Sequence, residues 1–162
     1  PISTNYAVNA AMEILTILPA LVDDLGNLDL RSRMAQAATF AGLAFSNTKT
    51  ALAHSISYPI TLRYGTPHGF ACSFSLPMVM RSAIGASATC DAGLRRIFGE
   101  DLSAGADRLE EFLVTLGVSV DKADYGVKDE EWRALIESAL TGERGRNFIG
   151  SHERVIESLG AA

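Results

Sequence analysis

The chain has 162 residues, of which 48% are hydrophobic and 20% are charged, and its formal net charge at pH 7 is −5. A chain of this length fits one domain with a substantial buried core, and its acidic balance argues against the clustered basic surface that a nucleic-acid partner requires. Asn9, Glu13 and Asp23 interrupt the apolar stretches well before the roughly 20 residues of a membrane span.

The N-terminal part of the chain predicts two helices joined by a short turn. Ser3 can cap a helix over residues 4–22, whose apolar residues cover more than one face, as is typical of a helix packed among others. Residues 23–27 supply turn-forming side chains, and Asp29 can cap a second helix over residues 30–45.

A third helix is expected to begin at Asn47 or Thr48. It should end near Ser57, because a residue that precedes a proline, here Pro59, is pushed out of the α region. Asn47 is interpreted as a helix cap rather than a ligand.

The rest of the chain also predicts helices. Pro67 suits the first turn of a fourth helix, which Pro77 should break or kink before residues 78–84. Further helices are expected over residues 90–98, 103–117, 129–141 and 151–159. No segment alternates with period two, so we predict one all-α, bundle-like domain of about eight helices over residues 1–162.

Two of the three histidines are separated by a segment that can bend. His54 and His68 lie fourteen positions apart, about 21 Å of rise on one continuous helix. Pro59 and Gly65 between them allow the chain to fold back, so the two imidazoles can converge on one point. Imidazole is a ligand suited to Fe(II), Zn, Cu or Ni. The alternative is that both are ordinary histidines satisfied by hydrogen bonds.

The segments around these histidines resemble a known metal-binding pattern. Phe45-Ser46-Asn47 followed by His54, and Pro67-His68-Gly69 leading into Leu76-Pro77, are similar to the metal-binding segment of the iron-containing (group III) alcohol dehydrogenase family. The resemblance extends more weakly over the whole chain. It implies a dehydroquinate synthase-like helical C-terminal domain that holds one divalent metal, next to an N-terminal domain that holds NAD(P).

The resemblance also implies roles for single residues. His54 and His68 match the two later metal ligands, and the metal would be Fe2+ or Zn2+. Phe45 matches an aromatic position that faces the substrate and nicotinamide pocket, although a core role is the alternative. Tyr58 stands where several relatives carry a proton-relaying histidine. It is expected either to donate a hydrogen bond to substrate or to pack.

The family's earlier Asp-x-x-x-His ligand pair is absent, and the chain opens at Pro1 without a methionine. We therefore interpret the chain as a fragment of a longer cytoplasmic two-domain enzyme that lacks its nucleotide-binding domain. That enzyme would transfer hydride between NAD(P)H and a small aldehyde. The chain alone should bind metal poorly, should be inactive, and should tend to self-associate through its uncovered apolar face. A non-enzymatic helical interaction module is the alternative.

Residues 54–60 resemble the subgroup of the family that reduces phosphonoacetaldehyde. Arg63 could then meet an anionic substrate group, the alternative being an exposed loop arginine. Cys72 and Cys90 lack a Cys-x-x-Cys partner and are interpreted as buried thiols, and His152 as a surface residue.

Overall fold

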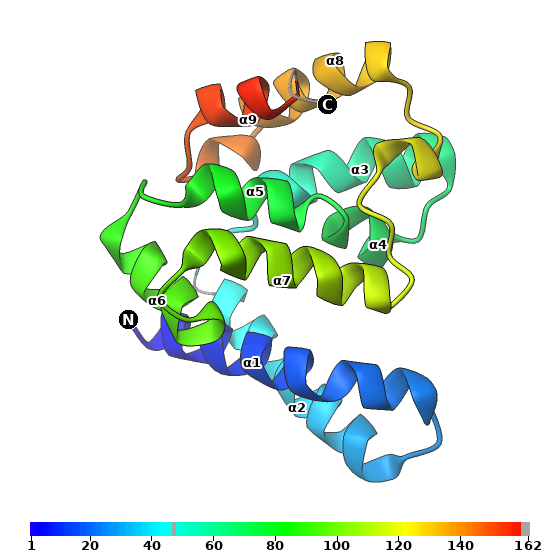
Figure 1. Ribbon diagram of the computed structural model, residues 1–162, viewed down its shortest axis with the longest axis vertical. Helices are drawn as coiled ribbons and strands as arrows, with labels where there is room; N and C mark the ends of the chain where they lie inside the picture. The colour runs from blue at the N-terminus through cyan, green and yellow to red at the C-terminus, as the bar shows by residue number, and fades with distance from the viewer. Residues whose placement is uncertain (47, 160–162) are drawn as a thin grey trace.

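The computed structural model describes residues 1–46 and 48–159, which form α-helices, two short 3-10 helices and no strand (Figure 1). The predicted all-α fold is therefore confirmed. The elements in chain order are α1 (Ile2–Asp23), α2 (Leu28–Ser46), α3 (Leu52–Tyr64), α4 (His68–Ser73), α5 (Leu76–Ala83), α6 (Ala88–Phe98), α7 (Leu102–Thr115), η1 (Lys122–Tyr125), α8 (Asp129–Thr141), η2 (Gly145–Asn147) and α9 (His152–Ser158).

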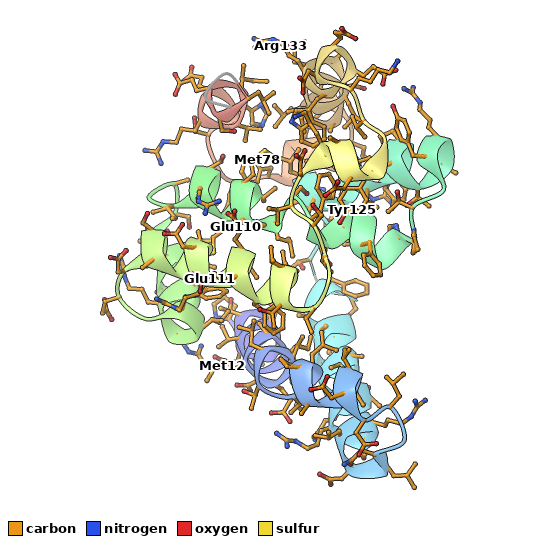
Figure 2. The ribbon with its side chains drawn as sticks, turned by 45° about the vertical axis from the view of Figure 1, so that its right-hand side comes forward. Met12, Met78, Glu110, Glu111, Tyr125 and Arg133 are labelled. Carbon is orange, nitrogen blue, oxygen red and sulfur yellow. The ribbon has the colours of Figure 1, made fainter. Side chains whose placement is uncertain are left out.

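Helices α1 and α2 form a hairpin at one end of the molecule, and α8 and α9 lie at the other end (Figure 1). Met12 on α1, Glu111 on α7 and Arg133 on α8 mark successive levels between these ends in Figure 2. The hairpin joins the remaining helices through contacts of α1 with α6, and α5 contacts both α7 and α9. Helices α3 and α4 pack against each other in the middle of the molecule.

Helix α1 is long and apolar enough to cross a membrane by length and composition, with a mean hydropathy of 1.3 over an 18-residue window. This differs from the sequence interpretation, in which polar residues excluded such a span. In this structure α1 lies along α2, and Glu13 in its middle pairs with Arg33 of α2 at 2.6 Å. A helix packed inside a protein passes the same test of length and composition. Of the apolar window of α1, 22% is buried inside the structure, where the helix packs against α2 and α6.

Of the two hydrophobic clusters among residues 1–46 and 48–159, the larger lies between α3, α4, α7, α8 and α9. Ile56 of α3 and Ile136 of α8 are fully buried in it, and Phe74 contacts the ring of Trp132 with 5.8 Å between centroids. These contacts fix α3 by its buried face and leave the opposite face free to carry polar side chains.

The smaller hydrophobic cluster joins α5 and α7 through Met80, Leu102 and Ala106. Beside it, Arg81 of α5 forms ion pairs with Asp107 at 2.7 Å and with Glu110 at 2.8 Å, both on α7. Glu110 is labelled in Figure 2. The two elements are therefore held together by apolar and ionic contacts.

Helix α3 differs most from its prediction. It begins at Leu52, continues through Pro59 and ends at Tyr64, before the capping residue Gly65, whose φ of 72° lies in the left-handed region that favours glycine. A proline inside a helix costs about 3 kcal/mol. The full burial of Ile56 and Ile60 on either side of Pro59 offsets this cost. The chain therefore folds back at Gly65 and not at Pro59. The predicted cap Asn47 lies outside the described residues.

Two predicted N-terminal caps are also wrong. Ser3 lies inside α1, where no side chain caps the helix. At α2 the cap is Asn27, whose Oδ1 accepts a hydrogen bond from the Leu30 amide at 3.1 Å. Asp29 instead lies in the first turn, where its charge suits the helix dipole.

Candidate metal centre

The two histidines of the distinctive segment meet across the α3–α4 turn. His54 lies in the first turn of α3, and His68 is the first residue of α4. Their ring centroids are 5.7 Å apart, and the rings meet edge-on at 70°. The left-handed turn at Gly65 and the extended Pro67 (ψ 135°) reverse the chain between them. The fold therefore brings together two imidazoles that are fourteen residues apart in sequence.

A third donor, which sequence reasoning missed, lies beside this pair. Cys72 follows His68 by one helical turn, and its Sγ lies 3.5 Å from Nε2 and 3.9 Å from Nδ1 of His68. One donor atom from each of His54, His68 and Cys72 lies within 4.8 Å of the others. The signal was the four-residue spacing on α4, which places two side chains on one helical face. Cys72 is partly exposed, so its interpretation as a buried thiol is wrong.

These three donors fit a borderline divalent cation. Imidazole and thiolate are the ligands with which Zn2+ is most often held, with Zn–N distances of about 2.0 Å and Zn–S distances of about 2.3 Å. In a tetrahedral shell with these bond lengths, neighbouring donor atoms lie roughly 3.3–3.7 Å apart. The Cys72–His68 distance of 3.5 Å falls in that range.

The surroundings of His54 favour the neutral form of its imidazole. Burial lowers the pKa of His54, and the nearby His68 and Arg144 lower it further. Burial raises the pKa of the Cys72 thiol, and a hydrogen bond with Ser57 partly opposes that rise. A neutral imidazole is the form that binds a metal, whereas the thiol has to lose its proton when it does so.

The lowered pKa of His54 predicts a pH dependence of folding in the metal-free chain. An unfolded chain protonates this histidine near pH 6.5 and the folded chain only at lower pH, so the unfolded state binds more protons in that window. The free energy of unfolding should therefore fall as the pH drops from about 6.5 towards the folded pKa. Urea unfolding at several pH values measures this, and His54→Gln should flatten that part of the profile. An unchanged profile in the variant would contradict the assignment.

Tyr58 and Arg144 stand next to the histidines. Tyr58 lies one turn after His54 on α3, and its ring stacks on His68 with 5.8 Å between centroids. The Arg144 Cζ atom lies 4.9 Å from the centroid of the Tyr58 ring. Arg144 also donates from Nε to the Thr50 hydroxyl at 3.1 Å. The described site thus contains a phenol and a cation as well as the three donors.

The turn that carries Arg144 requires a glycine at the next position. Gly145 is buried, and a Cβ atom there would collide with the carbonyl oxygens of Ala139 and Leu140. Asn147 donates from Nδ2 to the Thr50 carbonyl at 3.0 Å, so the same turn is tied to the chain just before α3. Nothing in the local sequence pattern relates residue 144 to residue 54.

The other predicted site residues lie apart from the three donors. Arg63 lines a groove with Ser55 and Pro59, and its position nine residues after His54 lies about 180° around α3 from that histidine. Phe45 lies at the end of α2 with 57% of its surface exposed, and it makes none of the ring contacts that join Tyr58 and the histidines. His152 stacks on Phe148 at 6.3 Å, outside the cluster.

A family model described as "Fe-containing alcohol dehydrogenase family, C-terminal" matches residues 1–161. An NAD-dependent methanol dehydrogenase of Bacillus methanolicus is 30% identical over 149 residues, which cover 86% of this chain and 39% of that protein. A phosphonoacetaldehyde reductase of Streptomyces viridochromogenes is 29% identical over 173 residues, which cover 99% of this chain and 42% of that protein.

Solved structures share the fold over the whole chain. An alcohol dehydrogenase from Oenococcus oeni superposes with a TM-score of 0.87 at 24% identity, covering 100% of this chain and 45% of that one. A sulfoacetaldehyde reductase from Bifidobacterium kashiwanohense, solved in complex with NAD+, superposes with a TM-score of 0.85 at 26% identity, covering 100% of this chain and 44% of that one. The chain therefore spans less than half the length of these relatives.

Proposed function

We propose, from the premise that this chain belongs to the Fe-containing alcohol dehydrogenase family, that it carries the metal-holding part of an NAD(P)H-dependent aldehyde reductase. The observation that carries the proposal is the convergence of His54 and His68 across the α3–α4 turn. These are the two residues whose sequence context resembles the family's ligand segment. Imidazole nitrogens suit Fe2+ as well as Zn2+.

The proposal requires a cofactor-binding part that lies outside this chain. The relatives are more than twice as long as the region they share with it. We propose that a nucleotide-binding domain outside these residues brings the nicotinamide towards His54 and His68. The cleft between the two domains would be the substrate site, as is common for small-molecule pockets.

Different residues of this chain would have different roles at such a site. A divalent cation, when bound, supplies Lewis acidity towards a carbonyl oxygen. His54 and His68 hold and orient it, one from each helix of the turn. Tyr58, exposed beside His68, presents a phenol that can donate a hydrogen bond to a substrate oxygen. Phe45, exposed at the end of α2, matches the family's aromatic pocket position and would face the substrate from outside the donor cluster.

This proposal is tested by assaying the whole protein for NAD(P)H oxidation with small aldehydes, before and after removal of metal by a chelator. Activity should disappear with the metal and return when Fe(II) or Zn(II) is added back. Activity that persists through complete metal removal, checked by elemental analysis, would show that the metal role is wrong.

A finer proposal concerns the substrate, which we propose to be an aldehyde with an anionic group, such as phosphonoacetaldehyde. Two of the relatives act on a phosphonate and a sulfonate aldehyde by name. In this chain Arg144, and not Arg63, places a guanidinium beside Tyr58 and the histidines. A guanidinium binds phosphonate or sulfonate oxygens through charge-assisted hydrogen bonds.

Changing Arg144 to Gln in the whole protein should raise the KM for phosphonoacetaldehyde at least about tenfold, because a hydrogen bond to a charged group contributes about 1.5–3 kcal/mol. The KM for propanal, which has no anionic group, should change far less. Steady-state kinetics with both aldehydes measure the difference, and Arg63→Gln serves as the matched control. Equal effects of Arg144→Gln on both aldehydes would rule out this role.

A further inference from the structure

We propose that Cys72 is a third ligand of the cation that His54 and His68 hold, so that this chain alone offers two nitrogens and one sulfur. The inference rests on the proposed metal centre but not on the reaction or the substrate. With the two imidazoles as its only ligands, the isolated chain was expected to bind metal weakly. With Cys72 as a third ligand, we expect tighter binding.

Helix α4 sets the geometry of the proposed ligand pair. His68 and Cys72 are four residues apart and share one face of this helix. The 3.5 Å between Cys72 Sγ and His68 Nε2 matches the edge of a tetrahedral shell with ordinary Zn–N and Zn–S bonds. His54 approaches from α3, so that each helix of the turn contributes at least one donor.

The thiol is also held in place by its neighbours. Ala71, the preceding residue, is fully buried in the larger core cluster and anchors α4. Ser57 of α3 is fully buried as well, and its hydroxyl donates to the His54 carbonyl at 2.8 Å. The two helices that carry the donors are therefore both anchored by buried residues.

A thiolate changes what the cluster can bind. As the sulfur–metal bond forms, the thiol proton is released to solvent, and the resulting thiolate supplies a negative charge that two neutral imidazoles lack. Thiolate is a soft ligand, so a set of two imidazoles and one thiolate favours Zn(II) and Co(II) over harder cations such as Mg(II).

Cobalt(II) is the appropriate probe, because its visible and near-ultraviolet spectrum reports both geometry and sulfur ligation. Titration of the reduced chain with Co(II) should give visible bands of tetrahedral intensity together with a thiolate-to-cobalt charge-transfer band. Cys72→Ser should remove the charge-transfer band and weaken Co(II) binding by more than about tenfold. The matched control is Cys90→Ser. Cys90 is the chain's other free cysteine and lies on α6, so its change should leave the charge-transfer band and the Co(II) affinity unchanged.

A second measurement covers the case in which Cys72→Ser does not fold, as judged by circular dichroism. In the unchanged chain, Zn(II) should protect Cys72 but not Cys90 from alkylation by iodoacetamide, read by peptide mass spectrometry. Cobalt bound without a charge-transfer band, or Cys72 alkylated equally with and without Zn(II), would overturn the proposal. If either result is found while metal binding still requires His54 and His68, the metal centre of the proposed function stands without Cys72. The absence of any Co(II) binding by the chain would also overturn the inference.

Discussion

Replacing His68 with Ala should lower the affinity of the chain for Zn(II) by more than about 100-fold, since even residues that only support a ligand contribute 10- to 100-fold. In the whole protein the same change should abolish metal-dependent aldehyde reduction. His68 is exposed at the first position of α4, so its removal should leave the fold intact. Isothermal titration with Zn(II) measures the affinity, and circular dichroism checks the fold.

The matched control for this prediction is His152→Ala. His152 is the chain's remaining histidine, and it lies outside the donor cluster, stacked on Phe148. The His152→Ala variant should keep the Zn(II) affinity of the unchanged chain. Equal loss in both variants would point to nonspecific binding by histidines, and retention of affinity in His68→Ala would remove His68 from the metal centre.

Replacing Ile56 with Ala should destabilise the fold by about 2–5 kcal/mol, because the change removes buried methyl and methylene groups and leaves a cavity. Ile56 is fully buried in the larger core cluster, on the face of α3 away from His54 and Tyr58. For a chain of this size, about 3 kcal/mol lowers the Tm by roughly 6–12 °C. Thermal unfolding followed by circular dichroism measures the shift.

Leu62→Ala on the same helix is the control, because 82% of the Leu62 surface is already exposed. A surface change of this kind usually stays within about 0.5 kcal/mol. If Ile56→Ala were as mild as Leu62→Ala, the core would not be what fixes α3. The continuation of this helix through Pro59 would then need another explanation.

Much of the fold was predictable because most helix boundaries are local. The helices expected over residues 129–141 and 151–159 match α8 (Asp129–Thr141) and, to within a residue at each end, α9 (His152–Ser158). The exception at Pro59 shows where local rules end. The prediction that the residue before Pro59 leaves the α region was wrong, because the burial of Ile56 and Ile60 depends on α8 and α9, which lie about 70 residues or more further along the chain.

The candidate site was predictable only in part, and for the same reason. His54 and His68 could be paired because one turn separates them. Cys72 was overlooked because a search for paired cysteines does not detect one thiol that acts with two imidazoles. Arg144 comes from a turn 90 positions after His54, and only the packing of α8 against α3 brings it to Tyr58. Contacts of that range have no signature in one sequence.

The placement of donors on both sides of the Gly65 turn has a thermodynamic consequence. An ion held by His54 and His68 acts as a cross-link that closes a fourteen-residue loop, and a loosened chain loses that closure. Binding of the ion at this site and folding of the chain then become linked equilibria. Once the free ion exceeds its dissociation constant, each further tenfold increase adds about 1.4 kcal/mol to the folded state. A chain of this kind would owe its resistance to heat partly to the ion supply around it.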